Sequence, residues 1–166
     1  MTLSHIMIAV HTLISIIAIV VGAFALRDLF RARASSPSLS AFIVLAIATS
    51  ATGFLCPLKG VSPAVVISIV ALVILAAVLL SQGRLRDSHW ARWVYVGGLV
   101  ASEYLLIFVG VVQAFTKIPA LEIVAPTQSE PPLAVAQGIV LVAFVVIGVL
   151  AVRAFGPQGV SQPSFR

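Results

Sequence analysis

Five long apolar stretches limit what this chain can fold into more than any other feature of its sequence. A helix needs about 20 apolar residues to cross the hydrocarbon core of a bilayer, and each stretch is close to that length or longer. The chain is 61% hydrophobic and only 9% charged, which leaves too little polar surface for a soluble monomer. We therefore predict an all-α integral membrane protein with five transmembrane helices, at about residues 3–26, 38–56, 63–80, 93–116 and 132–152.

The stretches form one predicted membrane domain, residues 1–155, followed by a flexible cytoplasmic tail at 156–166. We expect the first stretch to be retained rather than cleaved as a signal peptide. No charge precedes it, and no small-residue cleavage site follows it before Arg27. Prolines at positions 63 and 132 mark helix starts, and the connections are too short to hold a separate soluble domain.

The basic residues are distributed unevenly between the two sides of the predicted membrane. Two of the connections, together with the segment after the last stretch, hold eight of the ten Lys and Arg, and the other two connections hold only Lys59 and Lys117. Because basic residues are retained on the cytoplasmic side, we predict an N-terminus outside and a cytoplasmic C-terminus. The residues predicted to be cytoplasmic are Arg27, Arg31, Arg33, Arg84, Arg86, Arg92, Arg153 and Arg166.

Polar side chains are concentrated in the outer half of the predicted helices, whereas the inner half consists almost entirely of Ala, Val, Ile, Leu and Phe. This asymmetry predicts an outward-facing polar pocket. We expect the proline-framed segment 127–131 to lie over its mouth, near His11 and Gln137. The candidate pocket or proton-binding residues are Glu103, His11, Gln113, Gln137, Thr49, Thr52 and Ser102.

Glu103 lies near the predicted midplane of the fourth helix. A charged side chain there costs about 2.5–3.5 kcal/mol on insertion scales, so we expect it to point into the bundle, with Ser102, His11 and the hydroxyls of the second helix as partners. Burial favours the neutral acid, which can donate a hydrogen bond or carry a proton. The alternative is structural: Glu103, His11 and Gln137 join helices through hydrogen bonds of about 0.6 kcal/mol each.

Several chemistries do not fit the sequence. His5 and His11 share a helix and point about 120° apart, and His89 is on the other side of the predicted membrane, so a haem held by two histidines is not expected. One cysteine, Cys56, excludes an internal disulfide and paired-cysteine metal sites. No catalytic motif, phosphate loop or continuous basic patch for nucleic acid is present. We therefore assign no catalytic residue, no metal ligand and no cofactor.

Small residues on the fourth helix predict close helix packing. Gly98 and Ser102 form a small-xxx-small pair, which lets another backbone approach. We expect this contact within the monomer, with a subunit contact as the alternative. The expected partners are the lipid bilayer and either further copies of the chain or other subunits of a membrane complex.

Three segments, TGFLCPLKGVSPA (52–64), VQAFTKIPAL (112–121) and APTQSEPPLAVAQ (125–137), resemble a group of small, hypothetical bacterial inner-membrane proteins. The resemblance covers nearly the whole chain and implies a five-helix body in a bacterial inner membrane, with no activity to carry over. That group typically has an asparagine near Leu106 and an aromatic residue near Cys56, which argues against Glu103 as a shared active group.

Two functional hypotheses follow. In the first, the protein binds or transports a small solute or a proton through the outward-facing pocket. In the second, it is a non-catalytic accessory subunit of a larger membrane complex, as its small size and apolar faces suggest.

Overall fold

The computed structural model describes residues 3–55 and 63–155, which form six helices and no strand. Five of the helices are long and apolar enough to cross a membrane, so the all-helical, five-span prediction is confirmed at that level. The predicted tail, 156–166, lies outside the described residues. The helices are α1 (Leu3–Phe30), α2 (Pro37–Leu55), α3 (Pro63–Gln82), α4 (His89–Lys117), α5 (Pro119–Glu122) and α6 (Pro131–Ala154).

Serine caps and prolines set the helix starts. The Ser36 hydroxyl accepts a hydrogen bond from the Leu39 N–H at 3.3 Å, just before the proline that begins α2. The Ser88 hydroxyl accepts one from the Ala91 N–H at 3.3 Å, so α4 begins at His89, earlier than the apolar stretch alone predicts. Both caps satisfy N–H groups that a helix leaves without an internal partner.

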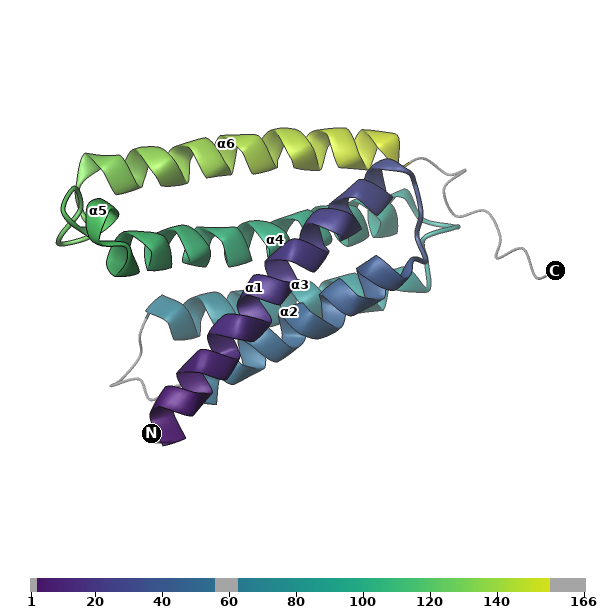
Figure 1. The fold of residues 1–166 in the computed structure, drawn as a ribbon. Coiled ribbons are helices and arrows are strands. Elements are labelled where there is room, and N and C mark those ends of the chain that lie inside the picture. The colour runs from purple at the N-terminus through teal and green to yellow at the C-terminus, as the bar shows by residue number, and fades with distance from the viewer. Residues whose placement is uncertain (1–2, 56–62, 156–166) are drawn as a thin grey trace.

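The helix α4 is the central element of the bundle and contacts every other helix. Figure 1 shows α6 running along one side of α4, α2 and α3 on the other side, and α1 crossing obliquely. The contacts of α1 are with α2, α4 and α6, and α6 contacts only α1 and α4 among the described helices. Much of α6 is therefore left exposed, including Val142 and Ile139, as expected for a helix that faces lipid.

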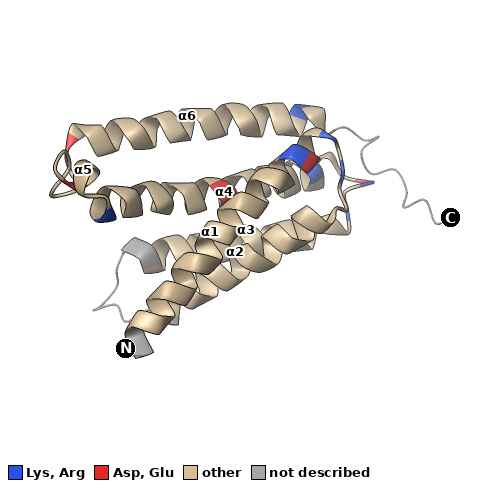
Figure 2. Ribbon diagram, in the orientation of Figure 1, with Lys and Arg blue, Asp and Glu red and all other residues tan. Residues whose placement is uncertain are grey.

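The basic side chains gather at the end of the bundle where α1 and α6 finish and α2 and α4 begin (Figure 2). Among the described residues, only Lys117 carries a basic side chain at the opposite end. We call the two ends the arginine end and the Lys117 end. The arginine end is defined by Arg27, Arg31, Arg33, Arg84, Arg86, Arg92 and Arg153.

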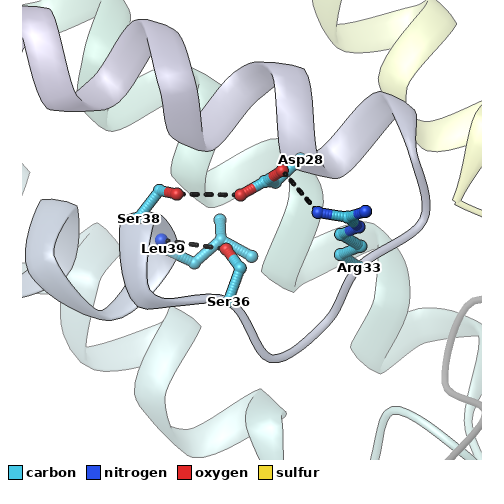
Figure 3. Close-up of polar contacts among 5 residues, drawn as sticks. All are labelled: Asp28, Arg33, Ser36, Ser38 and Leu39. Atoms are coloured by element: carbon cyan, nitrogen blue, oxygen red, sulfur yellow. Dashed lines mark hydrogen bonds and ion pairs between the residues drawn. The ribbon is translucent and has the colours of Figure 1, made fainter.

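A hydrogen-bonded turn joins α1 to α2 at the arginine end (Figure 3). The buried Asp28 carboxylate accepts a hydrogen bond from the Ser38 hydroxyl at 2.8 Å and lies 3.8 Å from the Arg33 guanidinium. The Arg33 N–H bonds to the Asp28 carbonyl and the Ala32 N–H to the Leu29 carbonyl, which is the Schellman pattern of a helix C-terminus. Ala32 has the left-handed φ of 53° that this pattern requires.

A large cluster of buried side chains fills the arginine end, with Phe42, Tyr95, Leu99 and Phe155 among its members. A small second cluster, Phe115, Ala125 and Leu133, lies at the Lys117 end.

The α4–α6 connection folds onto the ends of these two helices. Ala125 is only 1% exposed because it packs in the small cluster between α4 and α6. Thr127, Ser129 and Glu130 hydrogen-bond to one another, and no residue from 118 to 131 lines the large cavity described below. The expectation that 127–131 covers the pocket mouth is therefore wrong, since the buried Ala125 holds the segment against α4 and α6.

Candidate functional site

A cavity of about 500 Å³ lies between α1, α2, α3 and α4 in the half of the bundle nearer Lys117. Its lining runs from Ile8 to Ile19 on α1 and from Lys117 to Ser102 on α4. Beyond these residues, the buried cluster of the arginine end fills the bundle. The cavity is therefore a pocket with one closed end rather than a passage through the protein.

Three of the four helices of this site, α1, α2 and α3, are apolar on all sides, so small and polar residues determine where space remains. Gly53 and Ser50 on α2, Ser68 and Ala71 on α3, and Gly110 on α4 line the cavity. A side chain at Gly110 would meet only the end of Ile19, at 3.6 Å. The absence of bulk at these positions leaves a gap that the aliphatic side chains around it do not fill.

Four of the seven candidate residues line the cavity, and they come from three helices. These are His11, Thr49, Ser102 and Gln113. The other three, Thr52, Glu103 and Gln137, lie in packed positions around it.

His11 and Thr52 join α1 to α2 beside the cavity. The His11 Nδ1 and the Thr52 hydroxyl oxygen are 2.9 Å apart. The Thr52 hydroxyl also lies within hydrogen-bond distance of two carbonyls of its own helix, those of Ala48 at 2.8 Å and Thr49 at 3.1 Å. The contact between the His11 ring and the Thr52 hydroxyl holds the imidazole at the cavity wall, and the histidine tautomer decides which of the two donates.

Thr49 lies one turn deeper on α2 and is 7% exposed, yet its hydroxyl oxygen has no hydrogen-bond partner. A buried polar group left unsatisfied costs about 1–3 kcal/mol. Thr49 lines the cavity, but its hydroxyl oxygen is enclosed by protein and is not open to it.

Glu103 is buried inside the bundle, as predicted, at 1% exposure. Its carboxyl group lies against Gly22 of α1, in space that any side chain at position 22 would occupy. The expected partners are wrong: the Ser102 hydroxyl donates to the Gly98 carbonyl at 2.8 Å, His11 pairs with Thr52, and Glu103 Oε2 has no hydrogen-bond partner. The register of α1 on α4 places Gly22, which offers no side-chain donor, opposite the carboxyl group.

Of the two glutamines, Gln137 joins two helices and Gln113 lines the cavity. The Gln137 side-chain N–H donates to the Phe108 carbonyl at 3.0 Å and ties α6 to α4, which fits the structural interpretation of this residue. Gln113 is exposed and lines the cavity on the same helix as Lys117.

The Gly98 and Ser102 pair packs within the monomer. A side chain at Gly98 would overlap Val78 of α3, so the absence of one permits close approach of α3 and α4. Gly97, the next residue, has open space beside it.

Sequence reasoning missed Ser68 and Gly22. Ser68 is the only polar residue of α3 before Ser81 and lines the cavity, and this isolated hydroxyl was the available signal. Gly22 carries no such signal, because its role depends on which residue of another helix lies opposite.

The described residues contain no group of three or more His, Cys, Asp or Glu side chains able to hold a metal ion. No family model, curated protein or solved structure matches the chain. The geometry of the cavity therefore carries the functional interpretation.

Proposed function

We propose that this protein is a multi-pass membrane protein that binds a small solute in the cavity between α1, α2, α3 and α4. The supporting observation is the cavity itself: about 500 Å³ lies within the range of ligand pockets, and its lining is mainly aliphatic with a few polar groups. Those polar residues include His11, Ser68 and Gln113.

The proposal places the Lys117 end outside and the arginine end in the cytoplasm. The concentration of arginines at one end supports this orientation through the positive-inside rule. A bacterial inner membrane is the location we propose, on the resemblance of segments 52–64, 112–121 and 125–137. The cavity then opens toward the outer side.

We propose binding rather than proton-coupled movement. The cavity is closed at its inner end by the cluster around Phe42 and Tyr95, and Glu103 is not among its lining residues. A solute in the cavity therefore has no direct contact with the buried carboxyl group.

A pair of glycine substitutions on α4 tests the proposal. Gly110→Leu places a side chain into the cavity, whereas Gly97→Leu places the same side chain into open space. Native mass spectrometry of protein purified in mild detergent reports any small molecule that remains bound. We expect bound small molecules on the wild type and on Gly97→Leu, and their loss from Gly110→Leu.

Equal retention by Gly110→Leu would refute binding in this cavity. A foreign subunit present in stoichiometric amount, with no bound small molecule, would favour the accessory-subunit hypothesis instead.

A further inference from the structure

We infer that the cavity opens sideways into the membrane, between α1 and α4, and takes the hydrocarbon chain of an acidic lipid whose head group binds Lys117. This inference rests on the proposed function, since it names the ligand class of that cavity and its route of entry. Three features support it: the exposure of the lining residues, the separation of α1 from α4, and the position of the one charged residue of the lining.

The exposed residues of the cavity lining all belong to α1 and α4. They are Ile8, Thr12, Ile16, Gln113 and Lys117. The lining residues of α2 and α3 are buried or half-buried. A cavity whose exposed edges lie on two helices opens between those two helices.

The helices α1 and α4 separate toward the Lys117 end (Figure 1). Nearer the arginine end they are in contact, where the Glu103 carboxyl group lies against Gly22. Farther out α1 stays with α2 instead, since a Cβ at Gly53 would lie only 3.7 Å from the His11 ring. Neither α5 nor α6 contributes a residue to the lining, so these helices do not close the gap.

The opening extends along the helices into the depth of the membrane. Ile16 follows Ile8 by eight residues on α1, which is about 12 Å at the usual helical rise. One leaflet contributes about 15 Å to the hydrocarbon core of a bilayer. Lipid chains are therefore the molecules beside most of the opening, and one of them is able to enter without passing through water.

The polarity of the wall falls with depth, as expected for an amphiphile bound with its head outward. His11, Ser68 and Gln113 lie within about two turns of the helix ends at the mouth. Farther in, the Ser102 hydroxyl donates to a carbonyl of its own helix at 2.8 Å. The large side chains there are aliphatic, with Ile19, Leu75 and Leu106 among them. A hydrocarbon chain fits the inner part, and the oxygens near a lipid head group fit the outer part.

Lys117 gives the head group its charge. It is the only Lys, Arg, Asp or Glu of the lining, and it is exposed at the mouth. Among the described residues only Arg33 and Asp28 form an ion pair, so Lys117 has no described acid as its partner. Gln113 lies one turn away on the same face of α4 and lines the mouth as well. A negatively charged head group at this place is attracted to the ammonium group while its chain lies in the cavity.

Photolabelling in lipid nanodiscs tests the inference with probes that carry a diazirine on the hydrocarbon chain. The acidic probes are a phospholipid with a phosphoglycerol head group and a fatty acid, and the control is the phosphocholine lipid with the same chains. Tandem mass spectrometry then assigns the labelled residues. Ser50 and Ala71 are the reporters, because they line the cavity and are buried, and the lipid-facing Val142 on α6 gives the reference level.

We expect the acidic probes to label Ser50 and Ala71, and the phosphocholine lipid to label them about fivefold less relative to Val142. Labelling by either acidic probe supports the inference. Stronger labelling by one of the two identifies the source of the chain as a phospholipid or a free fatty acid.

Thr12→Trp and Leu13→Trp are the matched variants for the opening. Thr12 is exposed and lines the cavity, whereas Leu13 is 60% exposed and is not in the lining. The indole at position 12 narrows the gap between α1 and α4, so we expect labelling of Ser50 and Ala71 to be lost. The same indole at position 13 should leave their labelling unchanged.

Lys117→Gln and Lys117→Arg test the head group. Lys117→Gln removes the charge, and we expect about fivefold less labelling of Ser50 and Ala71 by the acidic probes with no change for the phosphocholine lipid. Lys117→Arg keeps the charge and should label like the wild type.

The outcomes separate this inference from the proposed function. Equal labelling in Thr12→Trp and Leu13→Trp would overturn entry between α1 and α4, and equal labelling by acidic and phosphocholine lipids would overturn the acidic head group. No labelling of the reporters by any probe, with a polar molecule in native mass spectrometry that Gly110→Leu loses, would overturn the lipid and leave solute binding intact. No labelling and no bound molecule would overturn both.

Discussion

The carboxyl group of Glu103 on α4 lies directly against Gly22 on α1. The carboxyl group of Glu103 occupies the space that a side chain at position 22 would need, and Oε2 has no hydrogen-bond partner there. The side chain is thus held mainly by packing. Of the two interpretations of Glu103 that the sequence leaves open, this contact favours the structural one, through close packing rather than through hydrogen bonds.

Gly22→Ala is expected to destabilise the protein by about 1–3 kcal/mol, because the new methyl group forces the Glu103 carboxyl out of its position. Thermal unfolding in detergent measures the effect. A second substitution, Glu103→Ala, removes the obstructing group, so the double variant should be more stable than the sum of the two single changes predicts.

Gly138→Ala is the control, because nothing lies within 4 Å of a side chain at that position on α6. It should be neutral or stabilising by up to about 1 kcal/mol, since alanine has the higher helix propensity. Similar losses for Gly22→Ala and Gly138→Ala would contradict the close contact.

The Glu130 carboxylate stabilises the turn before α6 through hydrogen bonds. Its carboxylate accepts hydrogen bonds from the Thr127 N–H at 3.0 Å, the Thr127 hydroxyl at 2.8 Å and the Ser129 N–H at 3.1 Å. Partial burial raises the pKa of Glu130, but these hydrogen bonds outweigh it and leave the pKa below its ordinary value of 4.5. The turn is therefore fully stabilised above pH 4.5 and loosens as pH falls through the lowered pKa.

Hydrogen exchange of the Thr127 and Ser129 amides, followed from neutral to acidic pH and corrected for intrinsic exchange, should show this loss of protection. Glu130→Gln should reduce protection already at neutral pH and remove most of the pH dependence. Glu122→Gln, on the exposed face of α5, is the control and should leave both amides unchanged. Protection that persists to the lowest pH would refute the role of the carboxylate.

At the scale of single elements, the turn that ends α1 contains backbone strain. Ala32 adopts a φ of 53°, a conformation that glycine adopts without strain and that costs other residues about 1–2 kcal/mol. Ala32→Gly should therefore stabilise the protein by about 1 kcal/mol, measured as a rise in melting temperature. Ala34→Gly, in the same turn but without a positive φ, should not be stabilising, and a gain of equal size there would contradict the explanation.

The helices themselves could be predicted from the sequence, because hydropathy and prolines act locally. The predicted helices at 63–80 and 132–152 begin within one residue of the observed starts of α3 and α6. The early start of α4 at His89 depends on the cap at Ser88, which lies in a polar segment that hydropathy does not weigh. The short α5 was missed because it has only four residues and lies within a connection between two predicted spans.

For the whole molecule, the predicted orientation is testable with single cysteines. We expect a membrane-impermeant maleimide to label Glu122→Cys on intact cells and to leave Arg31→Cys and Arg86→Cys unlabelled until the membrane is opened, all in a Cys56→Ser background. All three substituted positions are exposed. Labelling of Arg86→Cys with protection of Glu122→Cys would show that the orientation is the opposite of the predicted one.

The position of the candidate site could be predicted only in part. The outer-half concentration of polar residues predicts a single pocket, and four of the residues it selects, His11, Thr49, Ser102 and Gln113, line one cavity. Which side of each helix faces inward could not be derived, because α1, α2, α3 and α6 are apolar on all sides and carry no amphipathic signal. Thr52 on α2 and Gln137 on α6 differ from the prediction for that reason, and Glu103 differs because the residue opposite it on α1 could not be derived from the sequence.

The helix α1 crosses α4 obliquely (Figure 1), and Gly22 lies where the Glu103 carboxyl group meets α1. Ile8, at the cavity mouth, lies 14 residues from Gly22 on α1, about 21 Å at the usual helical rise. Over that length a tilt of about 3° at Gly22 moves the outer part of α1 by about 1 Å. A larger side chain at position 22 that tilts α1 would therefore also change the width of the pocket at its far end.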